Sequence, residues 1–281
     1  RPGPVVSLGV WDAFSAIVAE QEGFELLTLF GSMTSWSLIG KPDSGNITQT
    51  EMLDAARRVI RAANVPVIVD CDDGFGDPMN VRRTVQLVEQ LGAAGMYIED
   101  LKRPLRCSAL GGGRLVPSDD MVQKIHAAVE ARTDPNFFIM ARTDDYEGVD
   151  EVVRRAKKYV AAGVDMILAI GLTSEEAMAK VGMEAGVPIS TIQAAGTRMP
   201  LLPRDTLAGM GFKIIFHVPT MFSAAAHGMR LAARNLKADM DAGTVKPRVL
   251  PGPNPVEMEK MVGLDEDDAL QVRYSTGSCQ R

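Results

Sequence analysis

The sequence has few of the features that mark secreted or membrane proteins. It has only three cysteines, which lie far apart at Cys71, Cys107 and Cys279; this argues against a disulfide framework and for a reducing compartment. No apolar run reaches the length of a membrane span, and no charged-then-apolar secretory leader is visible. We therefore expect a cytoplasmic protein, although the numbering begins at Arg1 without a Met and leaves room for residues before it.

The sequence also lacks the charge pattern of a nucleic-acid-binding protein. Its basic residues are scattered, and the formal net charge is -6, so we expect no nucleic-acid partner. No solenoid repeat or low-complexity segment is present. With 281 residues, 46% of them hydrophobic, the chain can bury one large core or two small ones.

Short apolar runs alternate with helical patterns along most of the chain. The runs predict strands over 5–9, 26–30, 65–70, 96–100, 137–141, 166–170, 188–192 and 213–216. Such alternation implies a parallel sheet covered on both faces. Eight strand–helix units in about 240 residues fit an α/β fold of the (β/α)8 TIM-barrel type. A doubly wound open sheet is the alternative, which the lack of Gly-x-Gly-x-x-Gly after the first strand disfavours.

Local signals place the helices between these strands. Thr48 and Glu51 form a capping-box pattern for a helix that runs to about residue 62. Pro78 is expected near the start of the next helix, and Ser118 is expected to cap another. Residues 31–48 and 101–117 are predicted to be long loops. Further helices are expected over 13–20, 78–91, 118–132, 149–162, 175–182, 203–210 and from the eighth strand to about residue 242.

The end of the chain is rich in proline. Four prolines stand at Pro247, Pro251, Pro253 and Pro255, and proline cannot continue a helix. We therefore predict a barrel domain over 1–245 and a C-terminal helical arm over 246–281, with a last helix over about 255–274. Such an arm packs on its own barrel or on a neighbouring subunit, so we expect a homo-oligomer, either a dimer or a tetramer.

Two carboxylates follow the apolar run that begins at Val67. Because strand side chains alternate, Asp70 and Asp72 should point to the same side. They would repel each other unless a cation lay between them, and Mg²⁺ is the usual solution. The alternative is that Asp72 or Asp73 merely caps the next helix. Glu99 and Arg142 are also expected at the active-site ends of barrel strands, which favours the metal.

Five motifs connect these residues to a known family. They are Trp-Asp-Ala-Phe-Ser-Ala at 11–16, Gly-Ser at 31–32, Asp-Cys-Asp-Asp-Gly-Phe-Gly at 70–76, Ile-Glu-Asp at 98–100 and Ala-Arg-Thr-Asp at 141–144. Together they resemble the isocitrate lyase/phosphoenolpyruvate mutase superfamily over most of the chain. The resemblance implies a (β/α)8 barrel, often a tetramer with its last helix exchanged between subunits. It also implies Mg²⁺, with Mn²⁺ as a possible substitute, and chemistry through the enolate of a small 2-oxo acid.

The resemblance also implies roles for individual residues. Asp72 matches the most direct metal ligand, and Asp70 and Glu99 match carboxylates that hold the metal's waters. The segment of Gly31, Ser32 and Met33 matches the one that binds the substrate's carboxylate or enolate oxygen.

Other candidate residues complete the expected substrate site. Arg142 matches the arginine that binds the substrate's anionic end, and Asp43 matches an aspartate near the reacting centre. We further expect Trp11 to wall the pocket and Gln193 to present its amide to the substrate. Simple packing is an equal alternative for Trp11.

The loop after the fourth strand departs from the family pattern. The lyases carry Lys-Lys/Arg-Cys-Gly-His there, whereas this chain keeps Arg106 and Cys107 but lacks the lysine, glycine and histidine. Cys107 could still act as the acid/base, since a cationic loop lowers a thiol pKa; the alternative is an inert loop cysteine that survives after its partner histidine was lost. Ile170 stands where lyases carry a glutamate, and Ile192 and Ala195 stand where they carry an asparagine and a glutamate that bind the substrate's second carboxylate. An apolar wall there would favour a smaller or more alkylated substrate, because a buried carboxylate without partners is costly.

We therefore predict a Mg²⁺-dependent carbon–carbon lyase. It would cleave or decarboxylate a small 2-hydroxy or 2-oxo dicarboxylic acid through an enolate. One alternative is a mutase-like enzyme acting on a P–C bond. The other is a barrel that has lost catalysis and binds a ligand or partner.

Overall fold

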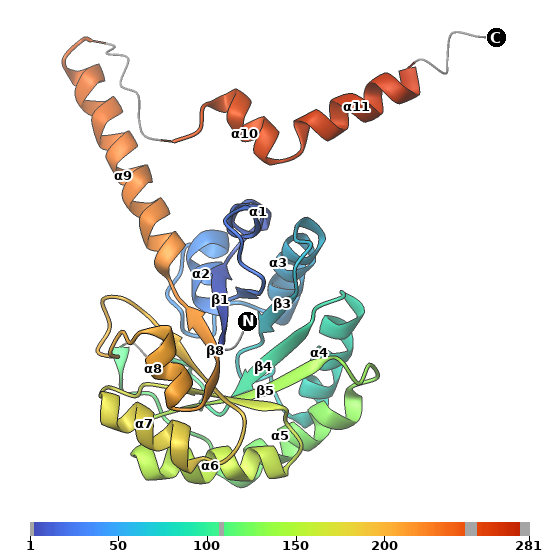
Figure 1. The fold of residues 1–281 in the computed structure, drawn as a ribbon, viewed down its shortest axis with the longest axis vertical. Helices are drawn as coiled ribbons and strands as arrows, with labels where there is room; N and C mark the ends of the chain where they lie inside the picture. Colours follow the sequence, from blue (N-terminus) through green and yellow to red (C-terminus); the bar gives the residue numbers. More distant parts are fainter. Residues whose placement is uncertain (1–2, 107–109, 245–251, 276–281) are drawn as a thin grey trace. The chain divides into compact units, whose positions relative to one another are not determined.

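The computed structural model describes residues 3–106, 110–244 and 252–275. Its strands form a closed parallel barrel in the order β1 to β8, with β8 pairing back onto β1; Figure 1 shows β1 and β8 side by side. The strands are β1 Val5–Val10, β2 Leu27–Leu29, β3 Val67–Asp70, β4 Gly95–Glu99, β5 Phe138–Asp144, β6 Met166–Ile170, β7 Ile189–Gln193 and β8 Phe212–His217. This confirms the (β/α)8 prediction, and the alternative of an open sheet is wrong.

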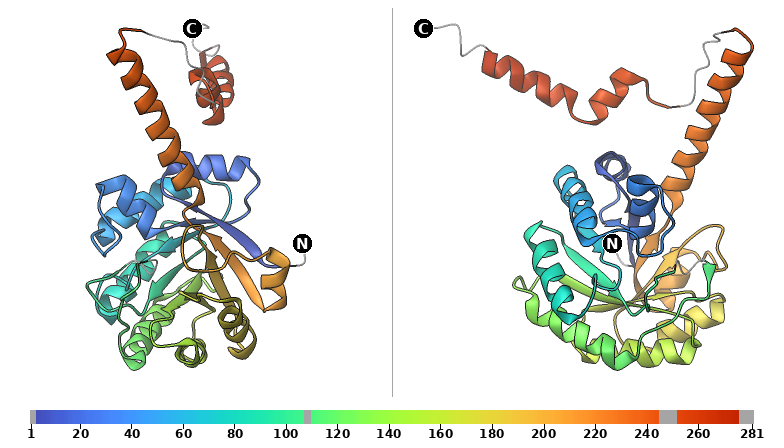
Figure 2. Two further views of the ribbon diagram at one scale, coloured as in Figure 1. Left: turned by 90° about the vertical axis from the view of Figure 1, so that its left-hand side faces the viewer. Right: turned by 180° about the vertical axis from the view of Figure 1, so that it is seen from behind.

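Helices follow the strands and cover the outside of the barrel (Figure 2). They are α1 Ala13–Gln21, α3 Gln49–Ala62, α4 Pro78–Gln90, α5 Ser118–Ala131, α6 Val149–Ala161, α7 Glu175–Glu184 and α8 Arg204–Gly209. The capping box of Thr48 and Glu51 is present at α3, and Pro78 is the first residue of α4. Ser118 does not cap α5; its hydroxyl instead accepts a hydrogen bond from Lys158 at 2.9 Å.

The predicted loop over 31–48 begins as a helix. Gly31–Thr34 form α2, and Ser35–Ile39 continue as the π-helix η1. The helix ends at Gly40, whose φ of 61° is left-handed. The predicted chain-breaking residues stand at and after Gly40, and Gly31 takes the first position of the helix, so the loop prediction is wrong for 31–39.

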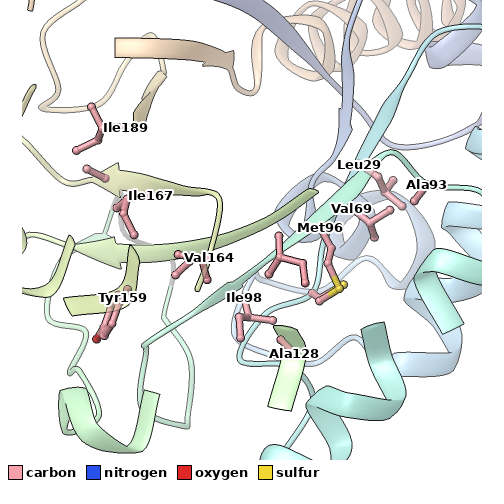
Figure 3. Packing of buried hydrophobic residues seen from close by; sticks show 14 of the residues in the cluster. Leu29, Val69, Ala93, Met96, Ile98, Ala128, Tyr159, Val164, Ile167 and Ile189 are labelled. Carbon is pink, nitrogen blue, oxygen red and sulfur yellow. The ribbon is translucent and has the colours of Figure 1, made fainter. Parts of the chain in front are cut away.

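The core has two layers, one outside and one inside the strands. The outer layer joins strands to helices and contains Val69, Met96 and Ile98, which Figure 3 shows. The inner layer fills the barrel and contains Ile68, Tyr97, Met140, Leu168, Ile192 and Phe216. Neighbouring residues of one strand thus alternate between the layers, as strand geometry requires. The alternation on β4 therefore sends Glu99 to the same side as Tyr97, into the barrel.

The rest of the chain forms a second compact unit over 223–281, after a first unit over 1–222. A helix α9 spans Thr220–Asp241. The predicted last helix is split into α10 Pro255–Met261 and α11 Leu264–Ser275 by Gly263, which has a φ of 104°. The predicted domain boundary and the homo-oligomer stay predictions.

In the described ranges, no helix combines the length and apolar character needed to cross a bilayer.

Candidate active site

The candidate side chains come from the carboxyl ends of neighbouring strands. Asp70 ends β3 and pairs in register with Tyr97, and Glu99 ends β4 and pairs with Arg142 of β5. In a parallel barrel all strands end at the same rim, so these side chains meet at one mouth. The structure thus places Asp70, Glu99 and Arg142 at the strand ends where the sequence analysis expected them, whereas their roles stay predictions.

The two aspartates converge on Gly31. The Gly31 amide donates to Asp70 Oδ2 at 2.9 Å, and the Asp72 amide donates to Asp70 Oδ1 at 3.1 Å. A Cβ on residue 31 would lie 3.1 Å from Asp70 Oδ2 and 3.2 Å from Asp72 Oδ1. Glycine at this position thus leaves room for both carboxylates.

Asp72 reaches the site by a different route from the one expected. Strand β3 ends at Asp70, so the alternation of strand side chains no longer applies at residue 72. Asp72 instead has a left-handed φ of 46°, which is uncommon for a residue with a side chain. Neither Asp72 nor Asp73 caps α4, because Asp77 does. The helix-cap alternative is therefore wrong.

The cluster carries an excess of negative charge. Burial raises the pKa of Asp72 well above its usual range, and the nearby charges of Asp70 and Asp43 raise it further. Burial also raises the pKa of Glu99, with Arg142 opposing that rise and Asp72 adding to it. A bound cation would reverse these shifts, since an opposite charge favours the ionised form.

The donors present fit a hard cation that keeps most of its waters. The described part of the chain holds no group of three or more His, Cys, Asp or Glu side chains arranged to ligate a metal ion together. Mg²⁺ does not need one, because it commonly binds one or two carboxylates and retains water. Tyr97 of β4 pairs in register with Asp70. Its buried hydroxyl has no hydrogen-bond partner among the described residues.

Arg142 lies between two carboxylates. Its Nη1 is 2.8 Å from Glu99 Oε2, and its Nε and Nη2 donate to the two oxygens of Asp144 at 2.9 and 3.0 Å. The fork on Asp144 fixes the plane of the guanidinium. Two carboxylates thus balance the charge of Arg142 in this structure.

The carboxylate of Asp100, which follows Glu99, supports the backbone of the cluster. Asp100 follows Glu99 and is buried, and its Oδ2 accepts hydrogen bonds from Thr143, Arg155 and Tyr159 at 2.9, 2.9 and 2.7 Å. These contacts join the end of β4 to β5 and α6. They hold the backbone from which Glu99 and Arg142 project.

A cavity of about 420 Å³ opens beside the cluster. Its polar lining includes Ser32, Asp43, Asp70 and Arg142. Its apolar lining includes Phe30, Trp36, Ile170, Ile192, Ala194, Met199 and Val218. Ile170 and Ala195, which stand where lyases carry polar groups, both line it. The expected apolar wall is therefore present.

Several expected substrate residues do not line this cavity. Trp11 packs edge-on against Phe222 with ring centroids 4.9 Å apart, and Met33 is fully buried in the inner core layer. The Gln193 amide is occupied by the backbone of residues 200 and 202. Cys107 lies outside the described residues, so its predicted role stays a prediction.

The sequence reasoning missed residues that the fold brings to the site. Trp36 and Arg198 line the cavity. Arg103 grips Asp73 with Nε at 2.9 Å and Nη2 at 2.6 Å, and its Nη1 donates to the Gly45 carbonyl at 3.3 Å. Arg103 therefore ties the aspartate turn to the segment that follows Asp43. Asp73 directly after Asp72 was the only sequence signal for this contact.

These features define a barrel enzyme with an acidic mouth suited to a divalent cation and a small anionic substrate. Residues 1–237 match the family model described as phosphoenolpyruvate phosphomutase. The chain is 35% identical over 278 residues to 2,3-dimethylmalate lyase of Eubacterium barkeri, covering 97% of this chain and 94% of that protein. It is 38% identical to 2-methylisocitrate lyase of Aeropyrum pernix, covering 86% and 77%. The chain belongs to the isocitrate lyase/phosphoenolpyruvate mutase superfamily, which confirms the resemblance.

Solved structures agree with this assignment. A crystal structure of 2,3-dimethylmalate lyase matches with a TM-score of 0.89 and 32% identity, covering 97% of this chain and 91% of that one. A phosphonopyruvate hydrolase in complex with oxalate and Mg²⁺ matches with a TM-score of 0.86 and 25% identity, covering 96% and 94%. The superfamily thus includes relatives named as lyases and a member solved with Mg²⁺.

Proposed function

We propose that this protein is a Mg²⁺-dependent lyase that breaks a carbon–carbon bond of a small 2-hydroxy or 2-oxo dicarboxylic acid. The observation that carries the proposal is the convergence of Asp70 and Asp72 on Gly31 beside a cavity that Arg142 and Ser32 also line. The names of the lyase relatives, which cover nearly the whole chain, support the same reaction class.

The proposed metal site uses the three acidic residues of the mouth. Asp72 would hold the ion most directly, while Asp70 and Glu99 would hold its waters. A bound Mg²⁺ supplies positive charge that stabilises an oxyanion developing on the substrate. Mn²⁺ would take oxygen ligands of the same kind.

The chain's own groups orient the substrate and move its protons. Ser32 Oγ lines the cavity and can donate to a substrate oxygen, and Arg142, fixed by Asp144, presents its guanidinium to an anionic end. Asp43 lines the same cavity from the segment that Arg103 anchors. We assign to Cys107 the delivery or removal of a proton at carbon, because breaking a carbon–carbon bond leaves a carbanion equivalent that must be protonated.

The proposal is tested by NMR of the protein with Mg²⁺ and a panel of acids. The panel contains oxaloacetate, 2,3-dimethylmalate, 2-methylisocitrate, isocitrate and phosphonopyruvate, observed by ¹H and ³¹P signals. A 2-oxo acid or other cleavage product that forms only with Mg²⁺, and is lost in Asp72→Ala, supports the lyase. Equal turnover with and without EDTA would refute the metal assignment.

A second candidate function is chemistry at a P–C bond. It is favoured by the match to the phosphoenolpyruvate phosphomutase model and to the phosphonopyruvate hydrolase structure. The ³¹P arm of the same experiment separates the two, because only this function changes the phosphorus signal of phosphonopyruvate. No reaction with any acid of the panel would favour a barrel that binds a ligand without catalysis.

A further inference from the structure

Two arginines line the cavity, and their surroundings differ. Arg142 is half-buried and pairs with both Glu99 and Asp144. Arg198 is exposed on the segment between β7 and α8, and it makes no hydrogen bond or ion pair with any residue that the structure describes. Its full charge is therefore available at the rim of the cavity.

The segment that carries Arg198 is held in shape by side chains around it. Gln193 accepts a hydrogen bond from the Leu202 amide at 2.9 Å, and its Nε2 donates to the Pro200 carbonyl at 3.3 Å. Thr197 Oγ1 donates to the Ala194 carbonyl at 2.8 Å and accepts from the Met199 amide at 3.3 Å. The contacts of Gln193 and Thr197 fix the backbone on both sides of Arg198. Gln193 thus helps to position the segment that carries Arg198.

The guanidinium of Arg198 reaches across to the loop that follows β4. Its Nη2 lies 3.3 Å from the point that a Cβ on Gly111 would occupy. Gly111 has a φ of 66°, and its carbonyl accepts a hydrogen bond from Arg106 Nε. Leu110, beside Gly111, lines the same cavity. Arg198 therefore stands where the loops of β4 and β7 meet at the rim.

The apolar part of the cavity lining offers no hydrogen-bond partner or opposite charge to an anionic group. Ile170, Ile192 and Ala194 belong to it, and a carboxylate against such side chains would lose its hydration without gaining a partner. A second carboxylate can be accommodated only where a cation meets it. Arginine is the residue best suited to that task, because its fork matches both oxygens of a carboxylate.

We propose that Arg198 is a specificity-determining residue that binds the second carboxylate of the substrate. The proposal rests on the function proposed above and names its substrate class more closely, as a di-acid whose distal carboxylate lies at the rim while its middle carbons face the apolar wall. It gives the second carboxylate a partner outside the apolar wall that Ile192 and Ala195 were expected to form.

The test compares two ligands that differ by one carboxylate. Malate is lactate with a carboxylate added to its methyl group, so the ratio of their dissociation constants isolates that group. Calorimetric titrations in Mg²⁺ would use the full chain, Arg198→Met, Arg198→Lys and the control Arg83→Met, which removes an exposed arginine of α4. Oxalate is the reference ligand, because it chelates a metal with both carboxylates and leaves none for Arg198.

The expected result follows from the strength of a charged hydrogen bond. Arg198→Met should weaken malate binding by about 10- to 100-fold and leave lactate and oxalate unchanged. Arg198→Lys should keep part of the preference for malate, and Arg83→Met all of it.

Other results would refute either the proposed function or the inference about Arg198. If the unmodified protein does not bind oxalate in Mg²⁺, the proposed function fails and this inference fails with it. If oxalate binds but malate is no better than lactate, or if Arg198→Met keeps the malate preference, only the inference about Arg198 is refuted.

Discussion

Replacing Arg155 with methionine tests the ion pair between Arg155 and Asp100, which supports the backbone at the barrel mouth. Arg155 of α6 is 4% exposed, and its Nη1 donates to Asp100 Oδ2 at 2.9 Å. Asp100 itself is fully buried. In Arg155→Met the carboxylate would keep only the hydroxyls of Thr143 and Tyr159 as hydrogen-bond donors at Oδ2. The substitution therefore leaves a buried negative charge without its cation.

The size of the effect follows from the burial of both partners. Removing one member of a buried ion pair costs about 3–5 kcal/mol, which corresponds to a fall in Tm of roughly 6–20 °C for a domain of this size. Arg154→Met is the matched control, because its side chain is 53% exposed and pairs with Glu151 on the helix surface. An exposed pair of this kind contributes about 0–1 kcal/mol.

The deficit should depend on pH. Burial raises the pKa of Asp100 to about 6, while the hydrogen bond from Tyr159 and the charge of Arg155 oppose the rise. Without Arg155 the pKa of Asp100 should rise further, so its carboxyl takes up a proton more readily in the folded state. The destabilisation of Arg155→Met should therefore be larger at pH 8 than at pH 6, and the part of it that is due to charge should be nearly lost by pH 5.

Urea unfolding of the three proteins at pH 8 and pH 5 measures both effects. A free energy of unfolding for Arg155→Met within about 1 kcal/mol of that for Arg154→Met at pH 8 would refute the reasoning. It would mean that the hydroxyls of Thr143 and Tyr159 suffice for the Asp100 carboxylate. A deficit that does not change with pH would show instead that lost packing, and not charge, is responsible.

Three further substitutions probe the mouth itself. Arg103→Met releases Asp73 and should lower kcat/KM by roughly 10- to 100-fold, with partial recovery in Arg103→Lys; unchanged kinetics would mean that the tie does not position the site. Tyr97→Phe removes a buried hydroxyl that has no hydrogen-bond partner among the described residues, so thermal unfolding of the metal-free protein should show no loss of stability. A loss above about 1 kcal/mol would mean that the hydroxyl has a partner. Cys107→Ser should slow turnover by about 100-fold or more; unchanged turnover would remove Cys107 from the mechanism.

The parts of the fold that depend on local pattern were predictable from the sequence. All eight strands and the seven helices from α1 to α8, apart from α2, lie where apolar periodicity and capping residues place them. The segment over 31–39 was not predicted, because a short helix and a π-turn at a strand end have no period long enough to detect. The split at Gly263 was missed for a similar reason, since one glycine inside a helical pattern is often tolerated.

The site residues at strand ends were also predictable from the sequence, whereas the conformation of residues in the loops was not. Asp70, Glu99 and Arg142 were predictable because the carboxyl ends of all the barrel strands meet at one mouth, where polar side chains on the inner side of a strand come together. The placement of Asp72 was correct although the reason was not, because it depends on a left-handed φ that no strand pattern encodes.

The substrate-facing wall was predictable only in part, because loops from opposite sides of the barrel build it. Ile170 ends a strand, and its place in the wall followed from the sequence. Gln193 also ends a strand, but a loop folds back and takes up its amide. The same loop brings Arg198 to the cavity rim. The residues next to Arg198 in the sequence did not predict this position. The acidic mouth was therefore predictable from strand ends, whereas Arg198, to which we assign substrate selection, was found only because the folded structure places it at the cavity.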